Sequence, residues 1–309
     1  MTHGAAPFRE GYAHANGQRI HYVANGDHGA PLLLFLHGFP EFWLAWRYCL
    51  AAFGQTHYAV AVDLPGYNLS DKPAALEAYR ARAVSNVVQA FVSALGYERC
   101  ILVGHDWGGA IGWYLAATRP AVVEGFVAIN AVHPTMFARE LATNPAQRLA
   151  SEYISFFCSE GAERKLCADD FAYLRSMFDT GSGRPSWFDE ATEAAYKTAW
   201  SQKGSLQGGL NYYRASSVTN ERSVEQSAVR PSGALTLRPM LVVVPTLVIW
   251  GKHDRFLLNG NLDGLQDYVP RVQIEWISDG SHWVVHEQPE RIVRLIASFV
   301  AEISGTSIN

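Results

Sequence analysis

Short, continuous apolar runs alternate with segments of helical spacing along most of this chain, and this alternation limits the folds available to it. The runs expected to form strands are 19–24, 31–37, 58–64, 100–105, 123–131, 245–251 and 272–277. Segments with the apolar spacing of a helix lie at 82–95, 107–119 and 289–303. Strands that alternate with helices in this way build a mostly parallel sheet with helices packed against it. The sequence therefore predicts an α/β fold.

The alternation stops between residues 133 and 238. Apolar side chains such as Phe171 and Leu174 recur there at helical spacing, and no buried-strand pattern appears. A stretch of about 100 residues has the size of a small subdomain. We therefore predict a core made of residues 1–132 and 239–309, interrupted by a helical cap at 133–238.

One junction between a strand and a helix carries residues suited to catalysis, in the segment Gly104-His105-Asp106-Trp107-Gly108. It has the G-x-S-x-G pattern of a nucleophile elbow, with Asp106 where serine would stand. Small residues at both ends let the strand turn sharply into the helix, and the turn lifts the central side chain above the sheet. Alone, the pattern also fits an ordinary helix N-cap. Its place between a buried strand and a helix favours the nucleophile.

An aspartate at this position changes the chemistry that the elbow can perform. A carboxylate is already ionised at neutral pH, so Asp106 needs no base to activate it. It can displace a leaving group at an sp³ carbon and form an alkyl ester. Water must then cleave that ester, and this second step needs a base.

Asp254 and His282 follow the last two predicted strands and complete the order of nucleophile, acid and histidine that an elbow of this kind requires. A carboxylate at the end of a strand is well placed to orient an imidazole, although Asp254 also fits a loop cap. His286, one helical turn after His282, is a weaker alternative for the base. We expect His253 to face outward and His105 to point toward the core side of the turn.

Two backbone N–H groups are expected to stabilise negative charge on the ester carbonyl. One belongs to Trp107, directly after the nucleophile. The other belongs to Phe39, in the loop His37-Gly38-Phe39-Pro40 after an early strand. Pro40 restricts this loop and has no N–H to donate. Taken alone, the loop also fits a plain strand-ending turn.

Composition argues against several other classes of protein. The 309 residues carry a formal net charge of −4 with no long run of one sign, so we expect no nucleic-acid partner. The apolar runs are far shorter than the ~20 residues that span a bilayer. Residues 1–7 lack the basic and apolar regions of a signal peptide. We therefore expect a cytoplasmic protein without membrane contact, with reduced cysteines, present as a monomer or homodimer.

Together these segments resemble the soluble epoxide hydrolases of the α/β-hydrolase superfamily, of the microbial, plant and mammalian type. The likeness runs from His37-Gly38-Phe39-Pro40-Glu41 to Gly280-Ser281-His282-Trp283 and is most characteristic at 104–109. It implies the α/β-hydrolase fold, with a helical cap over the pocket. Two local departures are Asn68, where relatives usually have glycine, and 157–161, which lacks their Phe-Gln-x-Pro-Gly.

The resemblance also implies residues that act from the cap. Two tyrosines would bind and protonate the epoxide oxygen, and the candidates are Tyr153 and Tyr213. Tyr212 is the alternative to Tyr213. The resemblance further suggests that Glu41 helps to hold the hydrolytic water, and that no metal or organic cofactor is needed.

The expected reaction is the hydrolysis of a small apolar epoxide to a vicinal diol. Asp106 would form the ester, and His282, oriented by Asp254, would activate the water. A haloalkane dehalogenase shares the nucleophile and base, but such enzymes often have an asparagine in the oxyanion loop, where this chain has Phe39. A catalytically silent hydrolase-fold protein that binds a small molecule is a third alternative. Detoxification, catabolism and signal-lipid processing are all roles that such chemistry serves.

Overall fold

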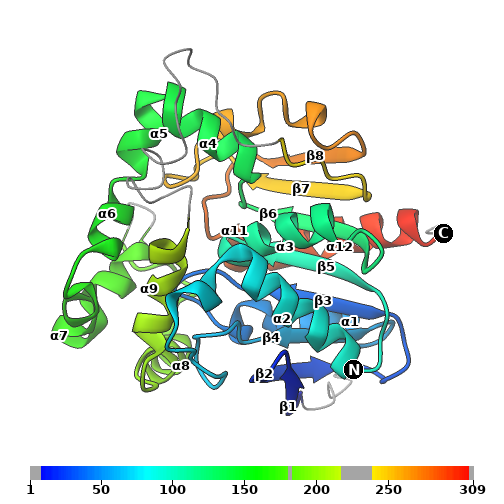
Figure 1. Ribbon diagram of the computed structural model, residues 1–309, viewed down its shortest axis with the longest axis horizontal. Helices are drawn as coiled ribbons and strands as arrows, with labels where there is room; N and C mark the ends of the chain where they lie inside the picture. Colours follow the sequence, from blue (N-terminus) through cyan, green and yellow to red (C-terminus); the bar gives the residue numbers. More distant parts are fainter. Residues whose placement is uncertain (1–7, 180–182, 217–238, 306–309) are drawn as a thin grey trace.

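In the computed structural model, residues 8–179, 183–216 and 239–305 are described, and their strands form one mixed sheet (Figure 1). The strand order is β1-β2-β4-β3-β5-β6-β7-β8. The strands are β1 (Arg9–Ala15), β2 (Gln18–Asn25), β3 (Leu32–Leu36), β4 (Tyr58–Val62), β5 (Cys100–His105), β6 (Val123–Ile129), β7 (Thr246–Gly251) and β8 (Val272–Ile277). From β4 to β8 all neighbours are parallel, whereas β2 pairs antiparallel with both β1 and β4. The predicted α/β fold with a mostly parallel sheet is confirmed.

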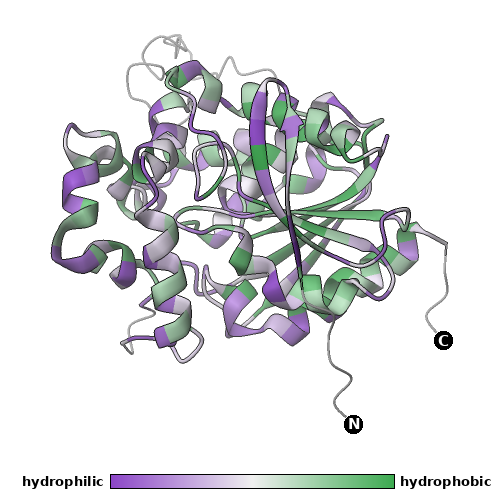
Figure 2. Cartoon of the chain, turned by 90° about the horizontal axis from the view of Figure 1, so that it is seen from below, coloured by the Kyte–Doolittle hydropathy of each residue, from purple (hydrophilic) through white to green (hydrophobic). Residues whose placement is uncertain are grey.

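Helices cover both faces of this sheet. Helices α2 (Ala81–Ala94) and α3 (Trp107–Thr118) pack on one face, and α1 (Arg47–Phe53), α11 (Val284–Glu287) and α12 (Pro289–Ile303) pack on the other. Successive side chains of a strand point to opposite faces, so Leu34 and Leu36 join the first layer while Leu33 and Phe35 join the second. Figure 2 shows the apolar character of the central strands. Each fully buried Leu or Phe contributes about 1.5–3 kcal/mol of transfer free energy.

A second group of helices lies between β6 and β7 and gathers over one edge of the core (Figure 1). These helices are α4 (Pro134–Thr143), α5 (Pro145–Ala150), α6 (Tyr153–Cys158), α7 (Ala162–Met177), α8 (Glu190–Trp200) and α9 (Ser205–Ala215). We refer to α4–α9 as the cap. Residues 217–238 of the predicted cap lie outside the described residues, so the division at 132/133 and 238/239 stays a prediction.

Indole N–H groups tie the cap to the core. Nε1 of Trp200, at the end of α8, donates to the carbonyl oxygen of Pro40 at 2.6 Å. Nε1 of Trp283, in the core, donates to the carbonyl oxygen of Met177 in α7 at 2.8 Å. Both bonds are buried, so they fix the cap above the loops that follow β3 and β8.

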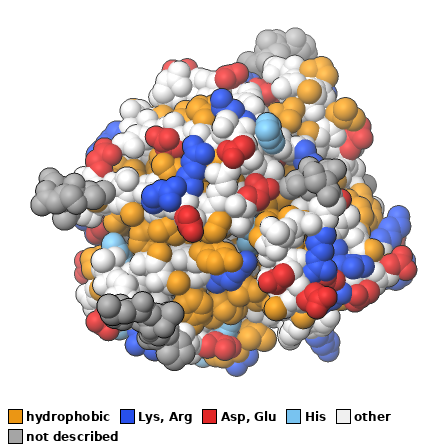
Figure 3. All heavy atoms as spheres, turned by 180° about the vertical axis from the view of Figure 1, so that it is seen from behind, with side chains coloured by type: hydrophobic (Ala, Val, Ile, Leu, Met, Phe, Trp, Pro, Cys, Tyr) orange, Lys and Arg blue, Asp and Glu red, His pale blue; other side chains and the backbone are white. Residues whose placement is uncertain are grey.

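Short 3₁₀ helices complete the regular structure at Trp43–Trp46, Leu76–Tyr79, Asn259–Leu262 and Leu265–Asp267. Within the described ranges, no helix is both long and apolar enough to cross a membrane. Figure 3 shows basic and acidic side chains interspersed on the face opposite to that of Figure 1, without a large field of one sign.

Candidate active site

The predicted nucleophile, acid, base and oxyanion loop lie where strands of the parallel sheet end. Asp106 follows β5, Asp254 follows β7 and His282 lies in the loop after β8. The loop that contains Phe39 follows β3, the neighbour of β5. Carboxyl ends of parallel strands meet at one edge of a sheet, which is the usual place for a ligand site in an α/β fold. The topology therefore brings together residues that are far apart in the sequence.

The elbow around Asp106 has the strained backbone that its sequence pattern predicts. Asp106 has φ 50° and ψ −119°, a conformation that non-glycine residues seldom adopt. A Cβ atom at Gly108 would lie 2.2 Å from the carbonyl oxygen of Leu36, so only glycine fits there. At Gly104 it would lie 2.6 Å from the backbone of Gly108. These two glycines let β5, the turn and α3 pack closely enough to hold the Asp106 side chain above the sheet.

The two carboxylate oxygens of Asp106 have different surroundings. Oδ1 accepts a hydrogen bond from the backbone N–H of Phe39 at 2.8 Å, and the backbone N–H of Trp107 also donates to the carboxylate. Oδ2 lies 3.7 Å from Nε2 of His282. Burial raises the pKa of the Asp106 carboxyl above its ordinary value, while His282 and His105 oppose that rise. One oxygen thus accepts from the N–H of Phe39 and the other faces the imidazole, and the N–H of Trp107 donates to the same carboxylate.

His282 lies between two carboxylates. Its Nδ1 is 2.7 Å from Oδ2 of Asp254, and its Nε2 faces Asp106. Burial by itself would lower the pKa of His282, but the charges of Asp254 and Asp106 raise it to about 9. In the resting site the imidazole is therefore a cation at neutral pH.

Asp254 accepts hydrogen bonds at both of its oxygens. The backbone N–H groups of Phe256 and Leu257 donate to Oδ1 at 2.8 and 2.9 Å. Nδ2 of Asn130 donates to Oδ2 at 2.8 Å, beside His282. Burial opposes the charge, but His282 and these donors lower the pKa of Asp254. Asp254 is therefore ionised when the imidazole of His282 is protonated.

Asn130 was not predicted as part of the site. It follows β6 directly, has φ 40°, and accepts a hydrogen bond from the backbone N–H of Gly251 at 2.9 Å. Its amide thus links the end of β6 to the end of β7 and to Asp254. The only sign of it in the sequence is a polar residue at the end of an otherwise apolar run.

Glu41 lies in a buried group with two histidines. Oε2 of Glu41 is 2.7 Å from Nδ1 of His105, and Oε1 is 2.6 Å from Nε2 of His286. His105 also contacts the carbonyl oxygen of His282 at 2.9 Å through Nε2. Burial opposes ionisation, yet the neighbouring histidines keep the pKa of Glu41 well below its ordinary value. Glu41 is fully buried and is engaged by His105 and His286, and its expected part in holding the hydrolytic water stays a prediction.

The other histidines lie where the sequence suggested. His105 is buried on the core side of the turn, and His253 is exposed. His286 is 2% exposed and its Nε2 is engaged by Glu41, so it does not reach Asp106 as a base. The geometry favours His282 over His286 as the partner of Asp106.

Two cap tyrosines share the cavity with Asp106. Tyr153 begins α6 and Tyr213 lies in α9, and a side-chain hydrogen bond links the two. Burial raises the pKa of both hydroxyls well above the ordinary range, and the nearby charge of Asp106 adds to this rise. Tyr212 instead donates its hydroxyl to the carbonyl oxygen of Pro65 at 2.9 Å. Of the two adjacent tyrosines, the geometry therefore favours Tyr213 for contact with a substrate.

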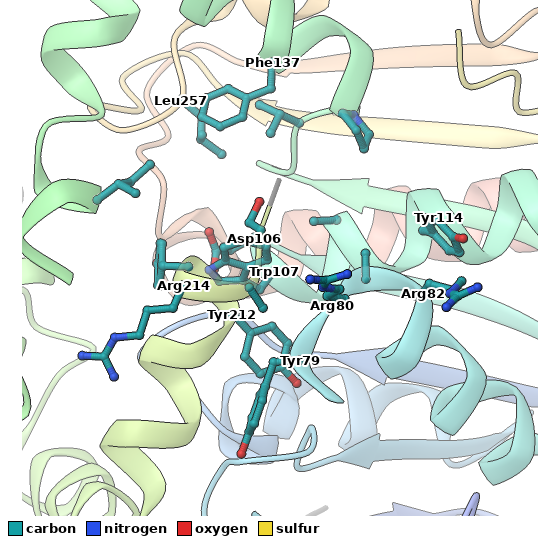
Figure 4. Close-up of a pocket in the computed structure, with 18 of the residues that line it drawn as sticks. Tyr79, Arg80, Arg82, Asp106, Trp107, Tyr114, Phe137, Tyr212, Arg214 and Leu257 are labelled. Atoms are coloured by element: carbon teal, nitrogen blue, oxygen red, sulfur yellow. The ribbon is translucent and has the colours of Figure 1, made fainter. Parts of the chain in front are cut away.

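A cavity of about 700 Å³ lies between the cap and the core, in front of Asp106 (Figure 4). This volume is within the range of small-molecule sites in proteins. Its walls are mostly apolar, with polar groups near the nucleophile and at the opposite end. The lining residues are Leu76, Tyr79, Arg80, Ala81, Arg82, Asp106, Trp107, Ala110, Tyr114, Val132, Pro134, Thr135, Phe137, Tyr153, Ile154, Tyr212, Tyr213, Arg214, Ala215, Ser216, Met240 and Leu257. In the part of the chain that the structure describes, no group of three or more His, Cys, Asp or Glu side chains is arranged to hold a metal ion.

Comparison with known families and curated proteins identifies relatives along nearly the whole chain. A family model described as the alpha/beta hydrolase fold matches residues 31–289. Epoxide hydrolase 4 of Mus musculus is 36% identical over 294 residues, which cover 93% of this chain and 77% of that protein. The AB hydrolase superfamily protein YfhM of Bacillus subtilis (strain 168) is 34% identical, over 94% of this chain and 96% of its own length.

Solved structures give the same result. The crystal structure of Bacillus megaterium epoxide hydrolase in complex with an inhibitor superposes with a TM-score of 0.85 at 34% identity, over 94% of this chain and 99% of that chain. A mutant of an epoxide hydrolase from the same organism, complexed with its diol product, gives a TM-score of 0.84 at the same identity and coverage. The likeness therefore covers the core and the described part of the cap together.

Proposed function

This chain belongs to the epoxide hydrolase family of α/β-hydrolase-fold enzymes, and we propose that it converts an epoxide and water to a vicinal diol through an alkyl ester on Asp106. The observation that carries the proposal is the environment of Asp106. Its Oδ1 accepts from the backbone N–H of Phe39, while its Oδ2 faces His282. A carboxylate held in this way can act as a nucleophile, and hydrolysis of the ester it forms can later return the carboxylate.

In the first step, Oδ2 of Asp106 attacks a ring carbon of the epoxide and the bond from that carbon to the ring oxygen breaks. The ring oxygen takes a proton from the hydroxyl of Tyr213 or Tyr153, which share the cavity with the nucleophile. Because burial keeps the pKa of both hydroxyls high, they are protonated at neutral pH and can donate. A phenol is a suitable acid for an oxygen that develops the basicity of an alkoxide.

The negative charge of Asp106 helps to raise the pKa of His282. Formation of the ester removes that charge, so the pKa of His282 falls. The imidazolium becomes more acidic and can return its proton to the tyrosinate left by ring opening. Neutral His282, still held by Asp254, then accepts a proton from water. The base needed for the second step is thus generated by the first step.

In the second step, the hydroxide formed from water attacks Cγ of Asp106. The negative charge develops on Oδ1, where the N–H groups of Phe39 and Trp107 stabilise it. The Cγ–Oδ2 bond breaks, and the diol leaves with a proton from His282. Asp106, which has gained the oxygen of the water, returns its proton to His282 and regains the resting state.

The cap tyrosines favour this reaction over release of a halide. A halide is a weak base that needs no proton, whereas an opened epoxide oxygen does. Tyr153 and Tyr213 supply that proton within the same cavity as Asp106. The substrate would be a small, mostly apolar epoxide, in keeping with the apolar cavity wall. A cytoplasmic location, a role in detoxification and a monomeric or dimeric state stay predictions.

The proposal is tested by incubating wild type, Asp106→Ala and His282→Gln with styrene oxide and trans-stilbene oxide. We expect diol from the wild type alone. His282→Gln should gain the mass of one epoxide on the intact protein, because alkylation does not need the base, and Asp106→Ala should gain none. Asp279→Asn is a matched control because this carboxylate is 72% exposed on its side chain.

Diol formation by Asp106→Ala at the wild-type rate would refute the nucleophile. Absence of an adduct on His282→Gln, with diol formed by the wild type, would refute the ester. If the wild type forms no diol, halide release from haloalkanes would support a dehalogenase. Tight binding of the epoxide without turnover would support the binding protein.

A further inference from the structure

Gln147 is a buried cap residue whose side chain binds the loop that follows β7. It lies in α5, and its Nε2 donates to the carbonyl oxygen of Phe256 at 2.8 Å, while its Oε1 accepts from the backbone N–H of Leu258 at 2.9 Å. Nε2 also donates to the hydroxyl of Ser151 at 3.0 Å, and Oε1 accepts from Nδ2 of Asn261 at 2.8 Å. The backbone partners are one acceptor and one donor, so the amide fits in one orientation only.

Gln147 and Asp254 hold the same peptide unit from opposite sides. The carbonyl of Phe256 and the N–H of Leu257 belong to one trans peptide, so they point in opposite directions. Gln147 donates to that carbonyl, and that N–H donates to Oδ1 of Asp254 at 2.9 Å. A hydrogen bond to the carbonyl polarises the peptide and strengthens its N–H as a donor. The chain of bonds thus runs from the cap through this peptide to Asp254, and from Asp254 to Nδ1 of His282.

Phe256 and Leu257, which share this peptide, also contact the site directly. The backbone N–H of Phe256 donates to Oδ1 of Asp254 at 2.8 Å. Its ring lies 5.2 Å from the imidazole of His282 and 5.4 Å from the ring of Tyr153, edge to face in both cases. The side chain of Leu257 lines the cavity (Figure 4). A rotation of this one peptide would therefore change both the hydrogen bonds of Asp254 and the packing of the imidazole.

We propose that Gln147 is a positioning residue for the hydrolytic step, which holds Asp254, and through it His282, in the orientation that activates water. This inference rests on the proposed function, because it assigns a further residue to the same reaction. Alkylation needs only the ionised Asp106 and a tyrosine hydroxyl, whereas the four hydrogen bonds of Gln147 go to other groups. Loss of the Gln147 amide should therefore slow ester hydrolysis much more than ester formation.

The test measures both half-reactions of Gln147→Met by single-turnover kinetics with styrene oxide. Methionine is unbranched like glutamine and fills similar space, but it cannot donate to the carbonyl of Phe256. One lost hydrogen bond corresponds to about 2- to 10-fold in rate, and we expect ester hydrolysis to slow by about this factor. Ester formation should change by less than about twofold, so the ester should accumulate on the intact protein.

Gln147→Glu tests the donated hydrogen bond by rescue. An ionised carboxylate presents only acceptors to the carbonyl of Phe256, whereas the protonated carboxyl can donate to it and still accept from Leu258. Burial raises the pKa of such a carboxyl above its ordinary value of about 4.3. Ester hydrolysis by Gln147→Glu, relative to the wild type at the same pH, should therefore recover as pH falls from about 9 to about 5. Gln147→Met should keep the same relative defect throughout.

Gln207→Met is the matched control, because Gln207 lies on the cap helix α9 and is exposed. It makes the same substitution in the cap and should leave both half-reactions unchanged. Ser151→Ala removes a hydrogen bond of Gln147 within the cap but keeps those to Phe256 and Leu258. It should therefore slow ester hydrolysis less than Gln147→Met does.

Equal slowing of ester formation and ester hydrolysis in Gln147→Met would overturn the positioning role, because it would indicate a general loss of structure. Hydrolysis at the wild-type rate would also overturn it, as would a defect of Gln147→Glu that does not recover at low pH. If Gln147→Met does not fold, the pH dependence of Gln147→Glu decides alone. In each of these cases the wild type still forms and cleaves the ester, so the proposed function stands. A wild type that forms no ester on Asp106 would instead refute the proposed function.

Discussion

Replacing Asp254 by asparagine changes one atom of the site and is expected to separate the two half-reactions. The Asp254 carboxylate accepts four hydrogen bonds, two at each oxygen. If the new NH₂ group took the place of Oδ1, it would face two backbone N–H groups. It should therefore take the place of Oδ2, where it meets His282 and Asn130.

In that position the amide donates to Nδ1 of His282 and fixes the neutral imidazole in the wrong tautomer. Nε2, which faces Asp106, would then carry the proton and could not accept one from water. One lost charge-assisted hydrogen bond costs about 1.5–3 kcal/mol, which corresponds to about 10- to 150-fold in rate. The wrong tautomer raises the loss in ester hydrolysis toward about 10⁴-fold.

The assay is single-turnover kinetics of Asp254→Asn with styrene oxide, combined with intact-protein mass. We expect alkylation to change much less than hydrolysis, so the ester should accumulate as a species heavier by one epoxide. Asp279→Asn should turn over like the wild type. Equal loss of both steps in a folded Asp254→Asn protein, with no ester detected, would contradict the reasoning.

Further predictions concern the acid and the stability of the site. Tyr213→Phe should slow alkylation about 10²- to 10⁴-fold, because a general acid is lost, as measured by the rate of ester formation. Tyr212→Phe should mainly cost about 1 kcal/mol of stability in a denaturant titration, because it removes a hydrogen bond to the carbonyl oxygen of Pro65. The pKa of His282 rises from 6.5 to about 9 on folding, which corresponds to about 3 kcal/mol. This contribution is fully present below pH 6.5 and is lost as pH rises through about 9, so the free energy of unfolding of wild type relative to His282→Gln should fall over that range. A difference that stays constant from pH 6 to about 10 would contradict this assignment.

Most of the core was predictable from the sequence because its strands are continuous apolar runs. The expected strands at 100–105 and 272–277 and the helix at 289–303 have the bounds of β5, β8 and α12. The strand β1 was missed. It lies at the edge of the sheet, its outer residues are exposed, and it pairs only with β2, so it lacks an apolar pattern.

The residues of the site were predictable where a local pattern marks them, as the elbow marks Asp106. The Glu41 group has no such mark, because His105 and His286 lie 64 and 245 residues from Glu41 and meet it only in the folded chain. The choice between Tyr212 and Tyr213 was also open. Adjacent residues of a helix point about 100° apart, and only the packing of α9 shows which one faces Asp106.

The most direct test of the central claim is the fate of the oxygen of water in a single turnover. With enzyme in excess over styrene oxide in H₂¹⁸O, we expect the peptide that contains Asp106 to gain one ¹⁸O. The diol should contain none, because it carries away Oδ2 of Asp106 and the original ring oxygen. A diol that contains ¹⁸O, with Asp106 unlabelled, would show that water attacks the epoxide directly and would contradict the account.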